Sequence, residues 1–328
     1  MKKNVVIACD YIKNLDSAAA DALDNLSQVN LIHRSLTNLG YNTLTLQFDG
    51  NLLNIKSALE KNRPAFVFNL VEDEAYISIA PFFFESINLP YTGCRAGSIY
   101  HTHNKLIFKR FLKFISFQKN ILTPRYVTAK DLSEFVPDKK YILKPTDRHS
   151  SISIDENSVK YFQNAKDIKR EILDRQKKYN FDFYAEEYIE GREFNISLLN
   201  GKILPRAEII FKDYKEDVPK IVCYKSKWDE SSFEYKNTIR SFDRKIEDQK
   251  LFDDMDDVII FLSRVLSIKT YARFDFRIDK NGNCYLLEIN TNPCLSDDSG
   301  FYAAANRGGL SYDEMVSAII KSSLKSYL

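Results

Sequence analysis

Residues 271–290 carry acidic and basic side chains at a spacing that could do chemistry. Two β-prone runs flank Asn281-Gly282, a dipeptide that favours a tight hairpin turn because both residues tolerate positive φ. If Lys280 pairs with Asn283 across a two-residue turn, the other cross-strand partners follow by counting back along the strands. This register places Asp275 opposite Glu288 and Arg273 opposite Asn290.

These four side chains share one face, because residues two apart on a strand point the same way. Facing carboxylates have Cβ atoms roughly 5 Å apart and destabilise a sheet unless a cation compensates them. The compensating cation could be Arg273 or Arg277, or it could be a divalent metal ion. Two carboxylates and an amide oxygen suit Mg²⁺ or Mn²⁺ and not zinc. The ion-paired and metal-binding interpretations both stay open on this evidence.

The opposite face of the hairpin is expected to join the core through its apolar residues, namely Phe274, Phe276, Leu287 and Ile289. A long polar segment, residues 291–299, follows the second strand. Polar segments at the ends of buried strands often carry functional groups. The sequence therefore favours a site at this end of the hairpin.

The composition describes a folded protein with balanced charge. Its 328 residues predict two or three packed units, and the chain is 44% hydrophobic and 28% charged. With 47 basic and 45 acidic residues the net charge is +2, which argues against nucleic acid or an anionic membrane as a partner. Basic residues at 105–119 alternate with apolar ones, a pattern typical of the solvated face of an amphipathic helix.

The five cysteines are dispersed and contain no Cys-x-x-Cys pair, which favours a reducing, cytoplasmic location. The apolar run at the N-terminus spans five residues, too few for a signal peptide, and no stretch is long enough to cross a membrane.

The first part of the chain alternates between strand and helix patterns. We expect strands at 5–9, 42–48 and 65–70, and helices at 16–39, ended by Gly40, and at 52–62. This order predicts a parallel sheet with crossover helices. The usual dinucleotide fingerprint is missing after the first strand. Residues 69–74 follow the third strand, where they could bind substrate or form a solvated strand exit.

The remainder mixes helices with hairpins. Helices are expected at 105–117, 164–178 and 246–268, a strand at 140–145, and a hairpin within 183–199 that turns at Glu190-Gly191. Residues 212–238 have no clear period and are expected to be a long loop, functional or disordered. Residues 311–314 form a capping box that opens the last helix. Lys144 and the serine-rich turn after it could hold phosphate, or could be an ordinary lysine and turn.

Taken together, these segments resemble the ATP-grasp ligases of the D-alanine–D-alanine ligase-like branch, from about residue 65 to the C-terminus. The matching motifs keep their order over more than 200 residues. They are Phe-Asn-Leu-Val-Glu at 68–72, Leu-Pro-Tyr-Thr-Gly at 89–93, Lys105, Leu-Lys-Pro at 143–145, Ser150-Ser151, residues 186–193, Lys227-Trp228, Arg-Phe-Asp at 273–275, residues 287–293 and residues 309–314.

The resemblance implies a role for each matched residue. Lys105, Lys144, Ser151 and Lys227 would contact ATP phosphates; Glu186, Glu187, Tyr188 and Ile189 would border adenine; Glu193 would hold the ribose. Asp275, Glu288 and Asn290 would bind Mg²⁺ or Mn²⁺. Arg273, Lys227 and Ser150 would be catalytic, and Asn69, Glu72, Asn292, Ser299 and Gly300 would meet the substrates. In this chemistry a carboxylate attacks the γ-phosphate, and an amine then displaces phosphate from the acyl phosphate.

The substrate end departs from the family pattern. Residues 9–14 lack the glycine-rich loop whose glutamate holds the first amino acid. His149 and Ser153 stand where the phosphate-covering turn usually has glycine. Trp228 replaces a common tyrosine, Cys294 a small residue, and Ser299-Gly300 the usual Ser-Leu.

We therefore expect an ATP-grasp α/β fold with an N-terminal domain at 1–99, a central lid at 100–190 and a catalytic domain at 191–328. The expected function is ADP-forming ligation of amino acids or small peptides. Two alternatives stay open: a D-alanine–D-alanine ligase proper, or an ATP-binding regulator that does not turn over. Relatives are commonly dimers, so the resemblance also allows a homodimer.

Overall fold

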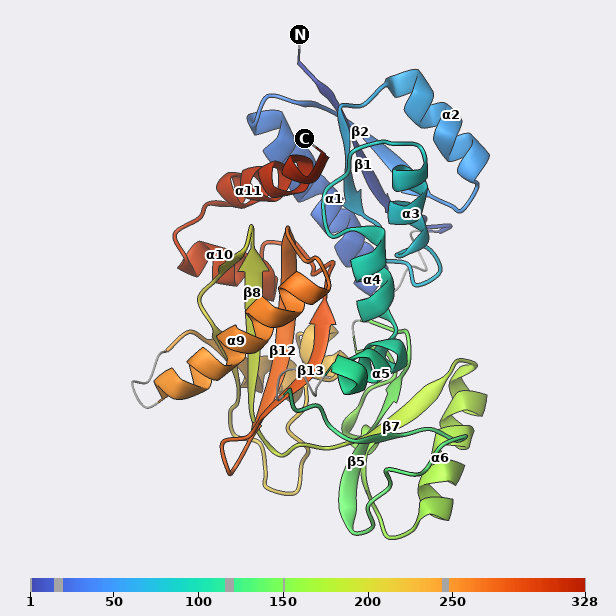
Figure 1. The fold of residues 1–328 in the computed structure, drawn as a ribbon, viewed down its shortest axis with the longest axis vertical. Helices are drawn as coiled ribbons and strands as arrows, with labels where there is room; N and C mark the ends of the chain where they lie inside the picture. The colour runs from blue at the N-terminus through green and yellow to red at the C-terminus, as the bar shows by residue number, and fades with distance from the viewer. Residues whose placement is uncertain (1, 15–19, 116–120, 150, 244–247, 328) are drawn as a thin grey trace.

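The computed structural model describes residues 2–14, 20–115, 121–149, 151–243 and 248–327. Within these residues the strands form three sheets, one at the N-terminal end of the molecule and two below it (Figure 1). None of the helices in the described ranges is long and apolar enough to cross a membrane. Ser150 and the outer ends of three expected helices (16–19, 116–117 and 246–247) lie outside the described residues.

The N-terminal sheet is parallel, with strand order β2-β1-β3, as the alternation of strands and helices predicts. Asn51 caps α2 by accepting a hydrogen bond from the Asn54 N–H, and Gly40 adopts φ +87° just after α1. The elements are β1 (Asn4–Asp10), α1 (Ala20–Asn38), β2 (Asn42–Phe48), α2 (Leu52–Asn62), β3 (Phe66–Leu70) and α3 (Ile79–Ser86).

The central sheet is antiparallel, with strand order β4-β7-β5-β6, and α6 covers one of its faces. Asn164 caps the start of α6, and Asn180 closes its end in the left-handed conformation. The elements are β4 (Tyr126–Val127), β5 (Lys139–Pro145), β6 (Val159–Phe162), α6 (Ala165–Tyr179) and β7 (Phe183–Glu187).

The C-terminal sheet has the order β11-β10-β8-β12-β13, with β9 paired to β8, and α9 packs on one of its faces. Its strands are β8 (Gly191–Leu199), β9 (Lys202–Ile203), β10 (Ala207–Phe211), β11 (Thr238–Ser241), β12 (Tyr271–Asp279) and β13 (Cys284–Asn290). The helices of this part are α7 (Tyr224–Trp228), α8 (Phe233–Asn237), α9 (Gln249–Val265), α10 (Gly300–Arg307) and α11 (Tyr312–Leu324).

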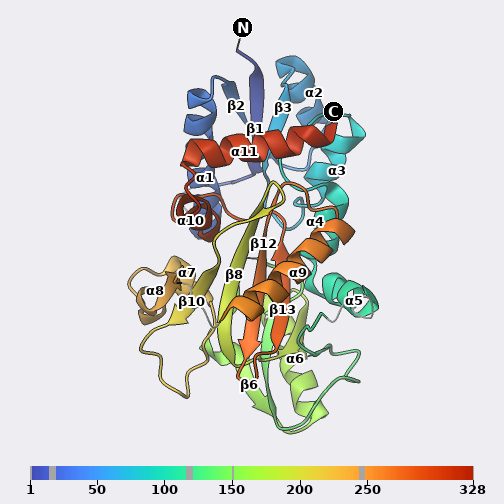
Figure 2. The ribbon, with the colours of Figure 1, turned by 60° about the vertical axis from the view of Figure 1, so that its left-hand side comes forward.

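Helices join the three parts across the expected domain boundaries. α4 (Ala96–His103) and α5 (Lys105–Ile115) pack on the C-terminal sheet and share its apolar core. α11 opens with the expected capping box of Ser311 and Glu314, runs beside α1 and contributes to the core beneath β1 and β3 (Figure 2). The boundaries at residues 99 and 190 therefore stay a proposal.

The hairpin at residues 271–290 keeps the expected partners only from Arg273 to Asp275, and its turn differs from the expected one. Asp279 N–H bonds to the Asn283 carbonyl, so the loop holds three residues instead of two. A bulge between Asp275 and Phe276 then shifts the register by one. Asp275 still faces Glu288 and Arg273 still faces Asn290.

Because of this bulge, the core-facing residue of β13 differs from the one expected. Phe276 pairs with Leu286, which is 1% exposed and lies in the core, whereas Leu287 is only partly buried. Leu287 was therefore the wrong choice for the core.

Two further expectations are wrong. β7 and β8 do not form a hairpin, because β7 pairs with β4 and β5 while β8 pairs with β10 and β12. Residues 188–190 thus carry the chain from the central to the C-terminal sheet. The segment 212–238 is not a plain loop, since α7 and α8 lie within it. Neither helix has more than five residues, which explains why no period is visible.

Candidate active site

The paired strands β12 and β13 place two carboxylates at the centre of the candidate site. Arg273 binds Asp275 through two hydrogen bonds of 2.7 Å, from Nε to Oδ1 and from Nη2 to Oδ2. Asn195 on β8 donates a third, of 3.0 Å, to Asp275 Oδ1. Of the two compensating arginines considered from the sequence, Arg273 is therefore the one that neutralises Asp275.

Glu288 lies on the same face of the hairpin as Asp275, and cationic side chains from other parts of the chain lie near it. Lys105 Nζ is 3.9 Å from Glu288 Oε2. Burial opposes the ionisation of Glu288, but Lys105, Lys144 and Arg273 outweigh it and lower its pKa to about 2. This carboxylate is consequently ionised at neutral pH.

A third carboxylate, Glu186 on β7, holds two lysines in the wall of the site. Glu186 is 1% exposed, with Lys109 Nζ 2.6 Å from its Oε2 and Lys144 Nζ 2.9 Å from its Oε1. The Tyr184 hydroxyl donates to Oε2 at 3.2 Å. Burial disfavours the charged carboxylate, yet the two ammonium groups hold the pKa of Glu186 below its ordinary value.

Lys109 was missed, because the basic run at 105–119 was interpreted as the solvated face of a helix. That interpretation is wrong for Lys105 and Lys109, which are 9% and 0% exposed. The two residues are four apart on α5 and so lie on one helix face. Two lysines at this spacing within an apolar stripe were the signal that could have revealed the second one.

Lys227 approaches from α7. Burial and the neighbouring Arg273 guanidinium lower its pKa, while Glu288, Asp275 and Glu193 act in the opposite direction. Residues of five elements thus meet in one place, although the first and the last of them, Lys105 and Glu288, lie more than 180 positions apart in the sequence. The elements are α5, β5, α7, β12 and β13.

Glu193 on β8 is paired with Arg277, the second arginine considered from the sequence. Arg277 Nε and Nη2 both donate to Glu193 Oε2, at 3.0 and 2.7 Å. Arg277 Nη1 donates to the Ile189 carbonyl at 3.2 Å, which ties β12 to the crossing between the sheets. Among the described residues, Glu193 Oε1 has no hydrogen-bond partner and can accept one from a ligand.

The segment before α7 lies between the turn after β5 and the connection at residues 188–190. Ser151 Oγ donates to the Val222 carbonyl at 2.8 Å, and the Tyr224 N–H bonds to the Ile154 carbonyl at 3.1 Å. On the other side, Tyr188 OH accepts from the Lys220 N–H at 3.0 Å. Ser151, one of the expected phosphate contacts, thus also secures this segment.

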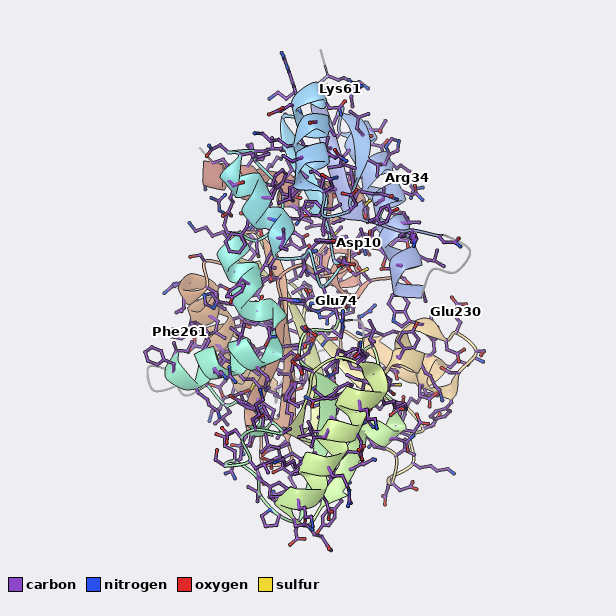
Figure 3. All side chains as sticks on the ribbon, turned by 90° about the vertical axis from the view of Figure 1, so that its right-hand side faces the viewer. Asp10, Arg34, Lys61, Glu74, Glu230 and Phe261 are labelled. Carbon is purple, nitrogen blue, oxygen red and sulfur yellow. The ribbon has the colours of Figure 1, made fainter. Side chains whose placement is uncertain are left out.

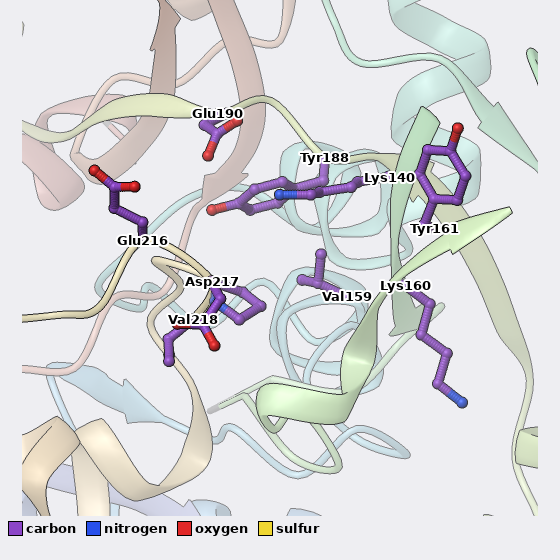
Figure 4. A pocket seen from close by; sticks show the side chains of 10 residues that line it. Lys140, Val159, Lys160, Tyr161, Tyr188, Glu190, Glu216, Asp217 and Val218 are labelled. Carbon is purple, nitrogen blue, oxygen red and sulfur yellow. The ribbon is translucent and has the colours of Figure 1, made fainter. Parts of the chain in front are cut away.

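A pocket of about 90 Å³ lies where residues 216–219 pass the connection at residues 188–190. Figure 4 shows the side chains that line it. The ring of Tyr188 lies beside the Lys140 side chain, and Val159 faces them from β6. Glu186 and Glu187 lie just before Tyr188 at the end of β7; Glu187 is partly buried, with Lys139 Nζ 3.5 Å from its Oε1.

The edge of the N-terminal sheet brings acidic groups to the site. Asp10, at the end of β1, accepts hydrogen bonds of 2.7 and 2.8 Å from the N–H groups of Glu72 and Asp73. Figure 3 places Asp10 and Glu74 midway along the molecule, between the N-terminal sheet and the lower parts. Burial raises the pKa of Asp10 to about 6. The sequence interpretation missed Asp10, since a single aspartate at a strand end carries no motif.

The expected substrate residues lie between this edge and β13. Asn69 is buried, and its Oδ1 accepts from the Val71 N–H at 3.3 Å. Glu72 accepts from Gln28 Nε2 at 3.1 Å. Asn292 joins the two parts, because its Nδ2 donates to the Val71 carbonyl at 3.1 Å and its Oδ1 accepts from the Tyr271 hydroxyl at 2.9 Å.

Ser299 and Gly300 open α10, where the Ser299 hydroxyl accepts from the Tyr302 N–H at 3.2 Å. Arg240 on β11 lies beside them: its Nη2 is 3.4 Å from where a Cβ of Gly300 would lie. Cys294 donates to Asp24 Oδ2 at 3.2 Å. Burial raises the pKa of the Cys294 thiol well above its usual value, so this cysteine is a weak nucleophile.

The donor set at β12 and β13 suits a hard divalent cation. Asp275, Glu288 and Asn290 offer only oxygen, and Mg²⁺ commonly takes one or two carboxylates plus substrate phosphates. Within the described ranges, no group of three or more Asp, Glu, His or Cys side chains is arranged to hold a metal ion. Both oxygens of Asp275 contact Arg273 here, so a cation would have to share that contact or replace it.

Comparisons with known proteins agree on one family. The model of the D-ala D-ala ligase C-terminus matches residues 130–321. D-alanine–D-alanine ligase of Aquifex aeolicus (strain VF5) is 27% identical over 275 residues, covering 80% of this chain and 86% of the relative. D-alanine–D-alanine ligase B of Clostridium perfringens is 29% identical over 248 residues, covering 74% of each.

The fold is also found in a solved structure. The D-alanine–D-alanine ligase of Bacillus anthracis complexed with ATP superimposes with a TM-score of 0.72 at 19% identity, covering 99% of this chain and 98% of that one.

Three sheets that bring lysines, an arginine and facing carboxylates together define an ATP-grasp enzyme, the class of ATP-dependent ligases that form carbon–nitrogen bonds. Because the family model covers more than half of its length, the chain belongs to the D-alanine–D-alanine ligase family. The resemblance and fold class expected from the sequence are confirmed.

Proposed function

We propose that this ATP-dependent ligase is ADP-forming and joins the carboxylate of one amino acid or small peptide to the amine of another through an acyl phosphate. One observation carries the proposal: Lys105, Lys144 and Arg273 surround Glu288 from three separate elements. With Lys109 and Lys227, five cations meet three carboxylates, Glu186, Asp275 and Glu288. The excess positive charge suits the triphosphate of ATP.

The phosphate end of ATP is assigned to Lys105, Lys144, Lys227 and Ser151. Lys144 is oriented by Glu186 at 2.9 Å, and Lys105 by the Arg148 carbonyl at 2.7 Å. Side chains held in this way bind without losing much further rotamer freedom. Ser150, expected to be catalytic, lies outside the described residues, and its role stays a proposal.

The nucleoside end is assigned to the crossing between the sheets. Glu186, Glu187, Tyr188 and Ile189 would border adenine, and Glu193 would receive the ribose. The pairing of Glu193 with Arg277 supports this role, because both guanidinium bonds go to Oε2 and leave Oε1 open.

Asp275, Glu288 and Asn290 would hold Mg²⁺ or Mn²⁺, which would neutralise phosphate charge when bound. The ionised state of Glu288 supports this assignment, since a metal ligand must be deprotonated. Asn290 Oδ1 already accepts from the Asn292 N–H at 2.9 Å, which fixes the direction of its amide.

The chemistry follows from the fixed cations. The donor carboxylate oxygen attacks the γ-phosphorus of ATP, the bond to the β-phosphate oxygen breaks, and ADP leaves with the bonding electron pair. The acceptor ammonium first loses a proton to solvent, and the amine attacks the acyl carbon. The carbon–nitrogen bond forms, the bond from the acyl carbon to the phosphate oxygen breaks, and phosphate leaves with the second proton of the nitrogen. Arg273 would stabilise the oxyanion of the second step, and Lys227 the transferred phosphoryl group.

The substrate end is assigned to Asn69, Glu72, Asn292, Ser299 and Gly300. The acidic edge of the N-terminal sheet supports an ammonium-bearing donor, because Asp10 and Glu72 lie there and the family's glutamate loop is missing. Arg240 beside Gly300 supports an acceptor that carries a carboxylate. D-alanine on both sides is the narrower alternative.

The test is a mass-spectrometric screen of products from ATP, Mg²⁺ and pooled D- and L-amino acids and dipeptides, with phosphate release measured in parallel. A new amide product with equimolar phosphate supports the ligase. D-alanyl-D-alanine as the sole product supports the narrower alternative. ATP binding without phosphate release across the whole panel contradicts the proposal and supports the regulator.

The proposal includes a cytoplasmic location and leaves a homodimer open. All five cysteines are free, which agrees with a reducing compartment. Sedimentation at several protein concentrations would test the dimer.

A further inference from the structure

Two histidines meet beside the phosphate end of the site, and no role above uses them. His103 Nδ1 lies 2.6 Å from His149 Nε2, and the ring centroids are 4.8 Å apart. His103 is the last residue of α4, and His149 lies in the turn that follows β5. Two elements distant in the sequence are thus joined by one ring-to-ring hydrogen bond.

This turn is already linked to the site. Lys105 Nζ donates to the carbonyl of Arg148, the residue before His149, at 2.7 Å, and the same ammonium is 3.9 Å from Glu288. Ser151 and Ser153 adopt φ of +58° and +60°, a backbone shape that favours glycine. The two left-handed residues follow His149, so the imidazole projects from the start of a tightly bent turn.

The charges around the pair are mainly positive. The charges of Lys105 on α5, Lys227 on α7 and Glu288 on β13 act on His149, and those of Lys105, Asp147 and Arg148 act on His103. Burial, together with Lys105, lowers the pKa of His103 to about 4 and that of His149 well below its usual value. Both rings are therefore neutral at pH 7.

The hydrogen bond between the rings can accept a further proton without breaking. In the neutral pair, one hydrogen bridges Nδ1 of His103 and Nε2 of His149, and a second sits on one outer nitrogen. Adding a proton places a hydrogen on both outer nitrogens and keeps the bridge. Among the described residues, neither outer nitrogen, His103 Nε2 nor His149 Nδ1, has a hydrogen-bond partner.

We propose that His149, held by His103, is a phosphate-binding residue, and that the pair takes up one proton from solvent when a triphosphate occupies the cleft. The inference rests on the proposed function, because it needs a nucleotide at this end of the site. The reason is electrostatic: phosphate oxygens reverse the sign of the local potential and accept a hydrogen bond from a charged imidazole.

The test is calorimetric titration of an unhydrolysable ATP analogue with Mg²⁺ at pH 7 in two buffers of different ionisation enthalpy. The difference in heat between the buffers gives the number of protons taken up. We expect uptake approaching one proton for the wild type and much less for His149→Asn or His103→Asn. AMP, which lacks the terminal phosphates, should bind with no uptake.

His101→Asn is the matched control, because His101 lies on the same helix as His103 but its ring packs beside Phe111, with the ring centroids 5.7 Å apart. It should match the wild type. His149→Gly places the family's usual small residue at this position. It tests whether the turn can bind the analogue without the imidazole. It should still bind the analogue, without uptake and about tenfold more weakly, the loss of one charge-assisted hydrogen bond.

Uptake that is equal in the wild type and His149→Asn overturns the inference, and so does binding of the analogue by the wild type with no uptake. Neither of these results affects the proposed ligase. Failure of the wild type to bind the analogue at all overturns the ligase and the inference together.

Discussion

Arg273 and Asp275, two residues apart on one face of β12, are joined by two parallel hydrogen bonds of 2.7 Å. The arginine proposed to stabilise an oxyanion thus also neutralises a proposed metal ligand. Such a pair keeps a buried carboxylate charged, and it fixes the plane of the guanidinium. A cation that binds Asp275 would therefore also change the hydrogen bonds of Arg273.

Asp275→Asn and Glu288→Gln should each lower turnover by at least about 100-fold while the protein stays folded. Both variants keep the size of the side chain but remove a negative charge that the proposed cation needs. Phosphate release measures the first effect, and circular dichroism the second. Asp254→Asn, an exposed carboxylate on α9, is the control and should retain full activity. Near-normal turnover in either site variant would contradict the metal assignment.

Glu186→Gln should destabilise the protein by about 3–5 kcal/mol at pH 7, because it leaves Lys109 and Lys144 without their shared carboxylate. Glu187→Gln is the matched control: Glu187 bonds one lysine at 3.5 Å near the surface, so its loss should cost under about 1 kcal/mol. Urea unfolding of both variants measures the difference. Equal losses would show that Glu186 does not hold the lysines in place.

The Glu186 effect should also depend on pH. Its folded pKa is lowered, so its stabilising contribution is present above the unfolded value of 4.5 and is lost as pH falls through the folded value. The deficit of Glu186→Gln should therefore shrink below about pH 4.5.

The sequence predicts those parts of the site that depend on neighbouring residues, and it does not predict those that depend on packing between distant segments. The partners of residues 273–275 agree with the prediction because two unpredicted features cancel, a turn one residue longer and a bulge after Asp275. Between the bulge and the turn the pairing differs by one residue, so that Phe276 pairs with Leu286 and not with Leu287. Turn length and bulges depend on packing against β8, which no window of sequence shows. The N-terminal parallel sheet, by contrast, follows from strand and helix periods alone.

The pairing of strands that lie far apart in the sequence also could not be predicted. Residues 183–199 have the local pattern of a hairpin, yet β7 and β8 join different sheets, because each finds better partners far along the chain. Asp10 was missed for the same reason, because its role comes from the backbone of Glu72 and Asp73, more than 60 residues away. Lys109 also has a distant partner, Glu186, although its spacing from Lys105 was a local signal.

Asp10→Asn should stabilise the protein at pH 8 by about 2 kcal/mol and have little effect near pH 4. Burial raises the folded pKa of Asp10 to about 6, so the penalty for its charge is absent below the unfolded value of 3.8 and grows as pH rises through 6. The asparagine keeps an oxygen for the N–H groups of Glu72 and Asp73. Urea unfolding at both pH values checks this. A variant less stable than wild type at pH 8 would mean that the charge is compensated.

Gly191→Ala should be strongly destabilising, because Gly191 sits where the chain crosses between the two lower sheets. Its φ is +153°, and an added Cβ would lie 1.8 Å from the Ile278 carbonyl oxygen on β12. That oxygen belongs to the backbone of a strand paired on both sides and cannot move away without breaking the sheet. We expect a loss of at least about 3 kcal/mol, or failure to fold.

Two other glycines separate this clash from ordinary glycine effects. Gly97 lies in α4 with open space around it, so Gly97→Ala should stabilise the protein by about 0.5–1 kcal/mol. Gly201 has φ +73° and open space, so Gly201→Ala measures backbone strain alone, about 1 kcal/mol. Thermal unfolding of the three variants should rank Gly97, Gly201 and Gly191 in order of increasing damage. If Gly191→Ala unfolds like Gly201→Ala, the close approach of β8 and β12 is not as tight as described, and the position of Glu193 against Arg277 would have to be revised with it.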